Sequence, residues 1–263
     1  MYVPAAYLHY RPLVRVLINA QKENFMSIKA VFFDLDGTLL PMDQEMFIQS
    51  YFGRLCKKMA PFGYDAKTLV KGIWGGTQAM IENDGSCRNE ERFWQVFPTL
   101  CGKDILNHVK TLDDYYANEF QQVQGDCGFD PNAAKAVALV KSFGWMAVLA
   151  TNPIFPLVAT ESRVRWAGLD LQDFDYYTVY ENSSFCKPNL RYYQSMLEHL
   201  NLKPEEVLMV GNDVGEDMIA EGLGMRVFLL THSLINKKNE DINRWPHGDF
   251  EDFFEYIKRI AEE

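Results

Sequence analysis

Short apolar segments rich in β-forming residues alternate with helix-length segments along most of this chain, and this alternation restricts the possible folds more than any other feature. The apolar segments are 29–34, 145–150, 176–180, 207–210 and 226–230. Helical patterns cover 131–141, 153–166, 189–200, 216–223 and 249–261. Helices of this length join strands through right-handed crossovers, which place the strands parallel in one sheet with helices on both faces. We therefore predict an α/β protein with a doubly wound parallel sheet.

The stretch between the first two apolar segments interrupts this alternation, because residues 42–128 carry helical patterns but no good buried strand. One helical face is formed by Phe47, Tyr51, Leu55 and Met59 at four-residue spacing, and we interpret this face as core rather than as a ligand site.

Two glycine-containing segments within this stretch, Trp74-Gly75-Gly76 and Asn83-Asp84-Gly85, are typical of turns or hinges. The expected organisation is a core of residues 26–41 and 129–263 that carries residues 42–128 as an inserted, all-helical domain. A chain of 263 residues has room for one large domain with such an insert.

Residues 1–25 differ in character from the rest of the chain. Leu13–Ile18 is mostly apolar, but Arg15 interrupts it, which argues against a membrane-spanning helix or a signal peptide. Two interpretations stay open: an additional N-terminal helix, or a native product that starts at Met26, where Met-Ser-Ile-Lys-Ala runs directly into the first strand.

Composition excludes several classes of partner. The 26 basic and 36 acidic side chains give a net charge of −10, which opposes binding to nucleic acid or to an anionic membrane. The five cysteines are odd in number and contain no C-x-x-C pair, so neither a disulfide framework nor a zinc site is indicated. A reducing cytoplasm fits this cysteine usage best.

Polar clusters follow four of the predicted strands, at the edge where open parallel sheets bind ligands. They are Asp34 to Thr38, Thr151-Asn152, Lys187-Pro188 and Gly211 to Asp217. In an extended chain Asp34 and Asp36 point to the same side, so their charges repel each other. A divalent cation with a further oxygen ligand from Asp213 would relieve this repulsion, and all-oxygen ligation suits Mg²⁺ better than zinc. A magnesium site at Asp34, Asp36 and Asp213 is therefore expected.

These clusters favour phosphoryl transfer. A carboxylate beside Mg²⁺ can attack phosphorus, while a second carboxyl group two residues further on protonates the leaving oxygen and later activates water. Lys187, the Thr151 hydroxyl and helix N-terminal amides can neutralise the phosphoryl charge. The sequence contains no H-E-x-x-H, G-x-S-x-G or Walker motif that would indicate a competing chemistry.

The segment D-L-D-G-T-L-L at 34–40 resembles the signature of the haloacid dehalogenase (HAD) superfamily, and the other three clusters follow in the order typical of that family. The resemblance covers roughly 29–42 and 129–230, and the helical stretch is similar in position to the family's helical cap. It implies a HAD-like Rossmannoid core, with Asp34 as nucleophile and Asp36 as acid and base. It further implies that Thr151, Asn152 and Lys187 bind phosphate, that Asp213 is a magnesium ligand, and that Gly37, Thr38, Asn212 and Asp217 support the site.

The resemblance predicts a Mg²⁺-dependent phosphomonoester hydrolase that acts on a small phosphorylated metabolite through an aspartyl-phosphate intermediate. Relatives that cleave carbon–halogen or phosphonate bonds lack the second aspartate, which is present here as Asp36. A sugar phosphomutase and a non-catalytic regulatory module remain alternatives. Many relatives carry an acidic residue where this chain has Asn212, so either Asn212 or Asp213 is the direct metal ligand. The substrate and the oligomeric state stay open.

Overall fold

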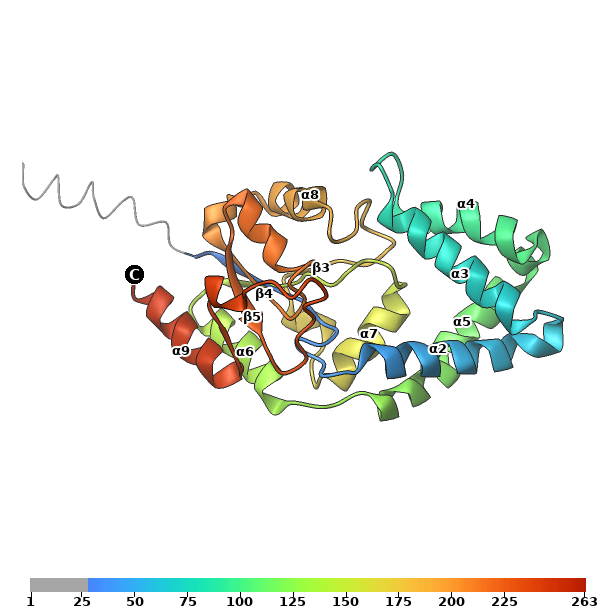
Figure 1. The fold of residues 1–263 in the computed structure, drawn as a ribbon, viewed down its shortest axis with the longest axis horizontal. Coiled ribbons are helices and arrows are strands. Elements are labelled where there is room, and N and C mark those ends of the chain that lie inside the picture. Colours follow the sequence, from blue (N-terminus) through green and yellow to red (C-terminus); the bar gives the residue numbers. More distant parts are fainter. Residues whose placement is uncertain (1–27) are drawn as a thin grey trace, which may run out of the picture.

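The computed structural model describes residues 28–263, in which a six-stranded sheet has the order β3-β2-β1-β4-β5-β6 (Figure 1). The strands are β1 (Ala30–Phe33), β2 (Met146–Leu149), β3 (Tyr176–Tyr177), β4 (Val207–Gly211), β5 (Arg226–Leu230) and β6 (His247–Gly248). All neighbouring strands run parallel, which confirms the predicted α/β class. Both interpretations of residues 1–25 lie outside the described residues.

The α-helices of the described chain are α2 (Gln44–Met59), α3 (Ala66–Ile81), α4 (Asn89–Cys101), α5 (Val109–Ala117), α6 (Pro131–Ser142), α7 (Leu157–Trp166), α8 (Leu190–Leu200) and α9 (Phe250–Ala261). Short 3₁₀ helices are η2 (Ala60–Phe62), η3 (Lys103–His108), η4 (Glu119–Asp126), η5 (Leu171–Asp173), η6 (Pro204–Glu206), η7 (Met218–Leu223) and η8 (Ile242–Arg244). Within residues 28–263, no helix has the length and apolar character needed to cross a membrane.

Both faces of the sheet are covered by helices, as the doubly wound prediction requires. Val31 and Phe33 of β1 belong to an apolar cluster with buried side chains of α6, α7 and α9. Ala30 and Phe32 point the other way and join a cluster with α8. The central strand is therefore buried on both faces, which explains why its sequence is a continuous apolar run.

Two helices begin where their capping residues indicate. The Asp130 side chain accepts a hydrogen bond of 2.8 Å from the Asn132 amide, and Pro131 occupies the first helical position of α6. Asp249 and Asp252 form a capping box at the start of α9. The helices predicted over 131–141 and 249–261 are thus confirmed to within one residue at each end.

Three predicted elements are shorter or different in the structure. The helix predicted from residue 153 begins only at Leu157, because Pro156 disfavours helical backbone at Phe155. The segment predicted as a helix over 216–223 contains the 3₁₀ helix η7 (Met218–Leu223) and no α-helix. The strand predicted over 176–180 pairs only at Tyr176–Tyr177, and the short edge strand β6 has no counterpart in the prediction.

Trp74-Gly75-Gly76 is not a turn, contrary to the prediction, but lies inside α3. A Cβ atom on Gly75 would lie 2.1 Å from Leu100 Cδ1, and one on Gly76 would lie 2.5 Å from Phe93 Cδ2. These glycines let α3 approach α4 closely, so their role is in packing. Asn83-Asp84-Gly85 does form the predicted turn, with Gly85 at a φ of 90° and the Ser86 amide bonded to Asp84.

The helices α2 to α5 lie together to one side of the sheet (Figure 1). The chain leaves and re-enters the sheet region at one place: Met42 and Cys127 form an antiparallel bridge, and the Gly128 amide donates a hydrogen bond of 2.7 Å to the Pro41 carbonyl. We call residues 42–128 the helical insert.

A second contact joins the helical insert to the sheet region at the start of α4. The Asn89 and Glu90 amides donate hydrogen bonds of 2.8 and 2.9 Å to the carbonyls of Ser183 and Tyr180. The Asn89 side chain is fully buried, and its amide nitrogen lies 3.2 Å from the Pro153 carbonyl. The insert therefore contacts the sheet region here as well as at its two junctions.

Candidate active site

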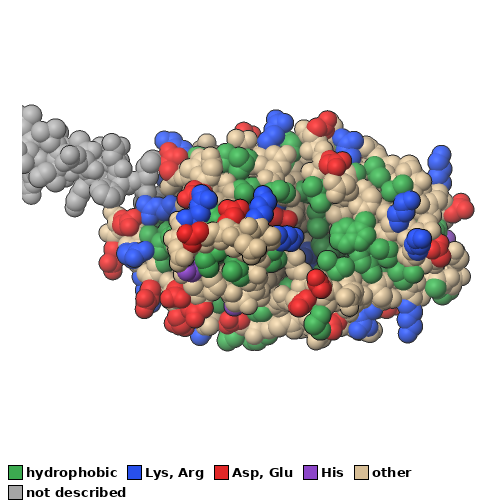
Figure 2. Space-filling model, in the orientation of Figure 1, with side chains coloured by type: hydrophobic (Ala, Val, Ile, Leu, Met, Phe, Trp, Pro, Cys, Tyr) green, Lys and Arg blue, Asp and Glu red, His purple; other side chains and the backbone are tan. Residues whose placement is uncertain are grey.

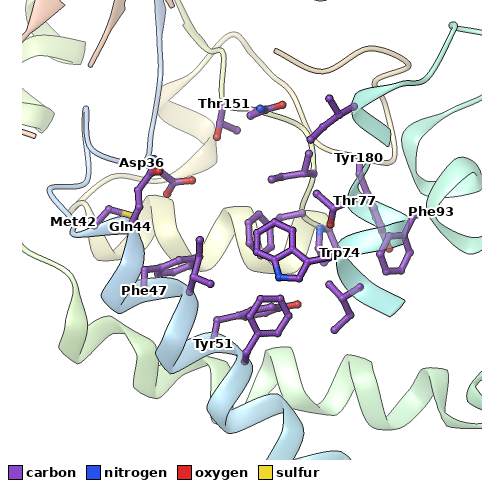
Figure 3. A pocket seen from close by; sticks show the side chains of 18 of the residues that line it. Asp36, Met42, Gln44, Phe47, Tyr51, Trp74, Thr77, Phe93, Thr151 and Tyr180 are labelled. Atoms are coloured by element: carbon purple, nitrogen blue, oxygen red, sulfur yellow. The ribbon is translucent and has the colours of Figure 1, made fainter. Parts of the chain in front are cut away.

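The four polar clusters meet at the carboxyl edge of the sheet. β1 lies between β2 and β4, and the strand order changes direction between β1 and β4. This is the switch point at which open α/β sheets bind ligands. A cavity of about 440 Å³ opens there, lined by residues of the clusters and of the helical insert. The space-filling view shows this hollow between the two parts of the molecule (Figure 2), and a close-up shows Asp36 and Thr151 at its sheet side (Figure 3).

Asp34, Lys187 and Asp217 form a buried ion-paired group. Lys187 Nζ lies 2.8 Å from Asp34 Oδ1 and 2.6 Å from Asp217 Oδ1. Burial disfavours the Lys187 ammonium, but the charges of Asp217 and Asp34 outweigh this effect and raise the pKa of Lys187 well above its usual value. Lys187 is therefore a permanent positive charge beside Asp34, which itself lines the cavity.

Asp36 is paired with an arginine that the sequence did not point to. Arg163 of α7 is fully buried and donates to Asp36 Oδ2, and its guanidinium lies 4.4 Å from the Phe155 ring centroid. The other oxygen, Asp36 Oδ1, is buried and has no hydrogen-bond partner among the described groups. Burial raises the pKa of Asp36, Arg163 opposes this, and the neighbouring Asp34 charge adds to the increase.

Asn212 is committed to protein contacts at both ends of its amide. Its Oδ1 accepts a hydrogen bond of 2.8 Å from Thr38 Oγ1, and its Nδ2 donates one of 2.7 Å to the Ser233 carbonyl. Gly37, at a φ of 88°, leaves room for this side chain, because a Cβ there would lie 2.3 Å from Asn212 Nδ2. Asn212 lies in the loop that follows β4. It connects this loop to Thr38 in the loop after β1 and to Ser233 in the segment after β5.

Asp213 keeps one carboxylate oxygen outside the protein's own hydrogen bonds. Oδ1 accepts from the Gly215 and Glu216 amides at 2.7 and 3.1 Å, whereas no described group bonds Oδ2. Among residues 28–263, no three His, Cys, Asp or Glu side chains form a group that could hold a metal alone. Mg²⁺ commonly uses one or two carboxylates and takes its other ligands from water and phosphate. The carboxylates of Asp34, Asp36 and Asp213 at the cavity offer oxygen donors that fit such a cation.

Thr151 and Asn152 both line the cavity, but they make different hydrogen bonds within the protein. Thr151 lines the cavity, and its carbonyl accepts hydrogen bonds from Thr178 Oγ1 and the Tyr192 hydroxyl. Asn152 also lines the cavity, but its Oδ1 accepts from the Lys187 amide at 3.2 Å and its Nδ2 donates to Glu216 Oε2 at 3.0 Å. Asn152 thus fixes the backbone of Lys187 relative to the segment that follows β4.

All predicted site residues lie at this edge of the sheet, and the structure adds Arg163 and Glu216 to them. Arg163 and Arg165 stand two residues apart on a helix, so they point to nearly opposite faces of it. This spacing could have indicated that Arg163 points inward. Glu216 lies in the fourth polar cluster itself and lines the cavity beside Asp213.

The fold and the site together define an α/β enzyme with a carboxylate-rich site at the sheet's switch point. The sequence model of the haloacid dehalogenase-like hydrolases matches residues 28–220, so the chain belongs to this family. It is accordingly a hydrolase.

Three known proteins show how far the similarity extends. The glyceraldehyde 3-phosphate phosphatase of Methanothermobacter thermautotrophicus is 26% identical over 223 residues, which cover 82% of this chain and 92% of that protein. Acyl-CoA dehydrogenase family member 10 of Mus musculus is 26% identical over 200 residues, or 76% of this chain but only 17% of that protein. A HAD phosphatase from Thermococcus onnurineus has the same fold, with a TM-score of 0.55 at 18% identity over 88% of this chain and 98% of that one.

Proposed function

We propose that the protein is a Mg²⁺-dependent phosphomonoesterase that hydrolyses a small phosphorylated metabolite through a phosphorylated Asp34. The observation that carries this proposal is the position of Asp34 at the cavity, with the Lys187 ammonium 2.8 Å from one of its oxygens. A carboxylate held beside a fixed cation can approach a phosphate dianion without being repelled by it.

In the first step, Asp34 attacks phosphorus and the bond from phosphorus to the ester oxygen breaks. Asp36 gives its proton to that oxygen, so the alcohol leaves uncharged. In the second step, Asp36 takes a proton from water, and the resulting hydroxide attacks phosphorus and releases Asp34.

Lys187 and Thr151 bind the transferring phosphoryl oxygens in this proposal. Asp217 positions Lys187, since it holds Nζ at 2.6 Å and also accepts from the Asp213 amide at 2.9 Å. Asp34, Asp36 and Asp213 would hold Mg²⁺, which supplies positive charge to the phosphoryl group when bound. The committed amide of Asn212 favours Asp213 over Asn212 as the ligand that follows β4.

We further propose that the helical insert is a cap over the leaving group, with residues 26–41 and 129–263 as the catalytic core. The five free cysteines favour a reducing cytoplasm as its location.

The deciding experiment is an assay of inorganic phosphate release from a panel of phosphomonoesters, with and without Mg²⁺. Release by the parent protein and its loss in Asp34→Asn support the proposal. Conversion of a sugar phosphate to its isomer without phosphate release would indicate the phosphomutase alternative, and saturable binding without turnover would indicate the regulatory module.

A further inference from the structure

The cavity at the active site has two chemically different ends. Its sheet end carries the carboxylates and amides described above. Its other end is formed by the helical insert and the loop before α7, which contribute aromatic side chains: Phe47 and Phe52 of α2, Trp74 of α3, Phe93 and Trp94 of α4, and Phe155. Figure 3 shows Phe47, Trp74 and Phe93 around the space beyond Asp36. A phosphate bound at the sheet end therefore directs its ester group toward aromatic surface.

This aromatic surface is open to a ligand. Trp74 is 47% exposed although it lies against Phe52, with ring centroids 5.7 Å apart. The space-filling view shows hydrophobic side chains gathered on the insert side of the hollow (Figure 2). The α2 stripe that the spacing predicts to be core has a second role, because Phe47, Tyr51 and Leu55 are buried and also line the cavity.

Few basic side chains line the cavity, so an anionic ester group would find few positive charges. Lys237 is the one basic side chain among the described residues that line the cavity. Its backbone belongs to the segment next to the sheet end, since Ile235, two residues earlier, exchanges backbone hydrogen bonds with Asn212 and Val214. The insert contributes one charged lining residue, Asp113 of α5, which repels anions. A second phosphate or a carboxylate on the ester group would find no cation there.

We infer that the preferred substrate is the phosphomonoester of an uncharged alcohol with an aromatic ring, and that esters of polyols and hydroxyacids are poor substrates. This inference rests on the proposed phosphomonoesterase function. It follows because an aromatic ring gains from burial against aromatic side chains, whereas a carboxylate loses hydration without meeting a cation, and a polyol meets only a few polar groups, such as Thr77, on a mostly apolar surface. Apolar contacts with the ester group select among substrates through binding and leave the reaction at phosphorus unchanged.

The experiment compares kcat/KM for 2-phenylethyl phosphate, glycerol 3-phosphate, glyceraldehyde 3-phosphate and 3-phosphoglycerate. All four release a primary alcohol, so the leaving groups differ little in reactivity. We expect 2-phenylethyl phosphate to exceed each of the others by at least about tenfold. Equal values, or a higher value for any polar ester, would overturn the inference while leaving the phosphomonoesterase function intact. Absence of phosphate release from every ester would instead count against the proposed function.

Variants test whether the aromatic surface is responsible. In Trp74→Ala, the ratio of kcat/KM for 2-phenylethyl phosphate to that for glycerol 3-phosphate should fall at least about fivefold, mainly through KM. Phe62→Ala is the matched control, because Phe62 is also an aromatic residue of the insert, is also 47% exposed and does not line the cavity. An unchanged ratio in Trp74→Ala, or an equal fall in Phe62→Ala, would overturn the assignment.

Binding can be measured without turnover. In the Asp34→Asn protein, 2-phenylethyl phosphate should change the tryptophan fluorescence saturably, since Trp74 and Trp94 line the cavity. Its Kd should be at least about tenfold lower than that of glycerol 3-phosphate, measured by competition. If the two Kd values are equal, the cavity does not select apolar ester groups.

Discussion

Arg163 and Asp36 form an ion pair across 127 residues of chain, in which the arginine is fully buried and the aspartate keeps 23% of its side chain exposed. The Arg163 guanidinium also donates to Thr160 Oγ1 and to the Ala159 carbonyl, so it is fixed within its own helix. A rigid donor that holds one oxygen of Asp36 restricts the orientation of that carboxyl group. The other oxygen, Oδ1, is left without a partner among the described residues.

We therefore predict that Arg163→Met lowers kcat by at least about tenfold and destabilises the fold by roughly 3 kcal/mol, because it leaves Asp36 without its buried partner. Arg163→Lys should recover part of the stability, but less of kcat, since a lysine lacks the planar fork. Steady-state kinetics and thermal unfolding check both effects. If kcat recovers fully in Arg163→Lys, charge alone is sufficient and orientation is not the reason.

Asp34→Asn should lower kcat by about three orders of magnitude or more, because an amide cannot act as the phosphorus nucleophile. The fold should persist, since Lys187 keeps Asp217 as a partner at 2.6 Å. Phosphate release and the melting temperature are the two measurements. Turnover within tenfold of the parent protein would contradict the covalent route.

Asp213→Asn and Asn212→Ala should have different effects. Asp213→Asn should weaken the apparent Mg²⁺ affinity by tenfold or more, about 1.4 kcal/mol, because a carboxylate is the stronger ligand for a hard cation. Asn212→Ala should mainly lower stability, by about 1–3 kcal/mol, because it removes the hydrogen bond to the Ser233 carbonyl and leaves the Thr38 hydroxyl with Asp34 as its remaining partner. Titration of activity with Mg²⁺, together with denaturant unfolding, separates the two. The reverse pattern would make Asn212 the ligand.

Gly76→Ala should destabilise the protein by about 1–3 kcal/mol, because the new methyl group meets the Phe93 ring between α3 and α4. Gly53→Ala is the control within the same insert: Gly53 lies in α2 with no atom within 4 Å of the new Cβ, so this change should stabilise by about 0.5–1 kcal/mol. Denaturant unfolding of both variants decides whether packing or helix propensity governs these positions. Stabilisation by Gly76→Ala would refute the packing role.

The sequence predicts the sheet and the location of the site well for one physical reason. A buried parallel strand has a local signature, and the carboxyl ends of neighbouring parallel strands always meet, so Asp34 and Asp213 come together once the strands are identified. Features that depend on partners distant in the sequence escape this reasoning. Arg163 needs Asp36 to explain its burial, and β6 exists only through its pairing with β5.

Gly75 and Gly76 also show that local sequence cannot predict a feature that depends on distant partners. Judged by local propensity they interrupt a helix, and local propensity therefore predicts a turn there. The nearby Leu100 and Phe93 side chains of α4 reverse this conclusion, because only a residue without a side chain allows the two helices to pack so closely. No local property of residues 74–76 carries that information.

The backbone hydrogen bond between Gly128 and Pro41 holds the two ends of the helical insert next to each other. Since the chain leaves and returns across one hydrogen bond of 2.7 Å, the two junctions are already as close as the ends of a tight turn. Exchange of residues 42–127 for a segment of another length would leave the two junctions in place, but it would remove the hydrogen bonds of Asn89 to Ser183 and Pro153. The insert can therefore vary in length between two fixed junctions, provided that the contact of Asn89 with the sheet region is kept.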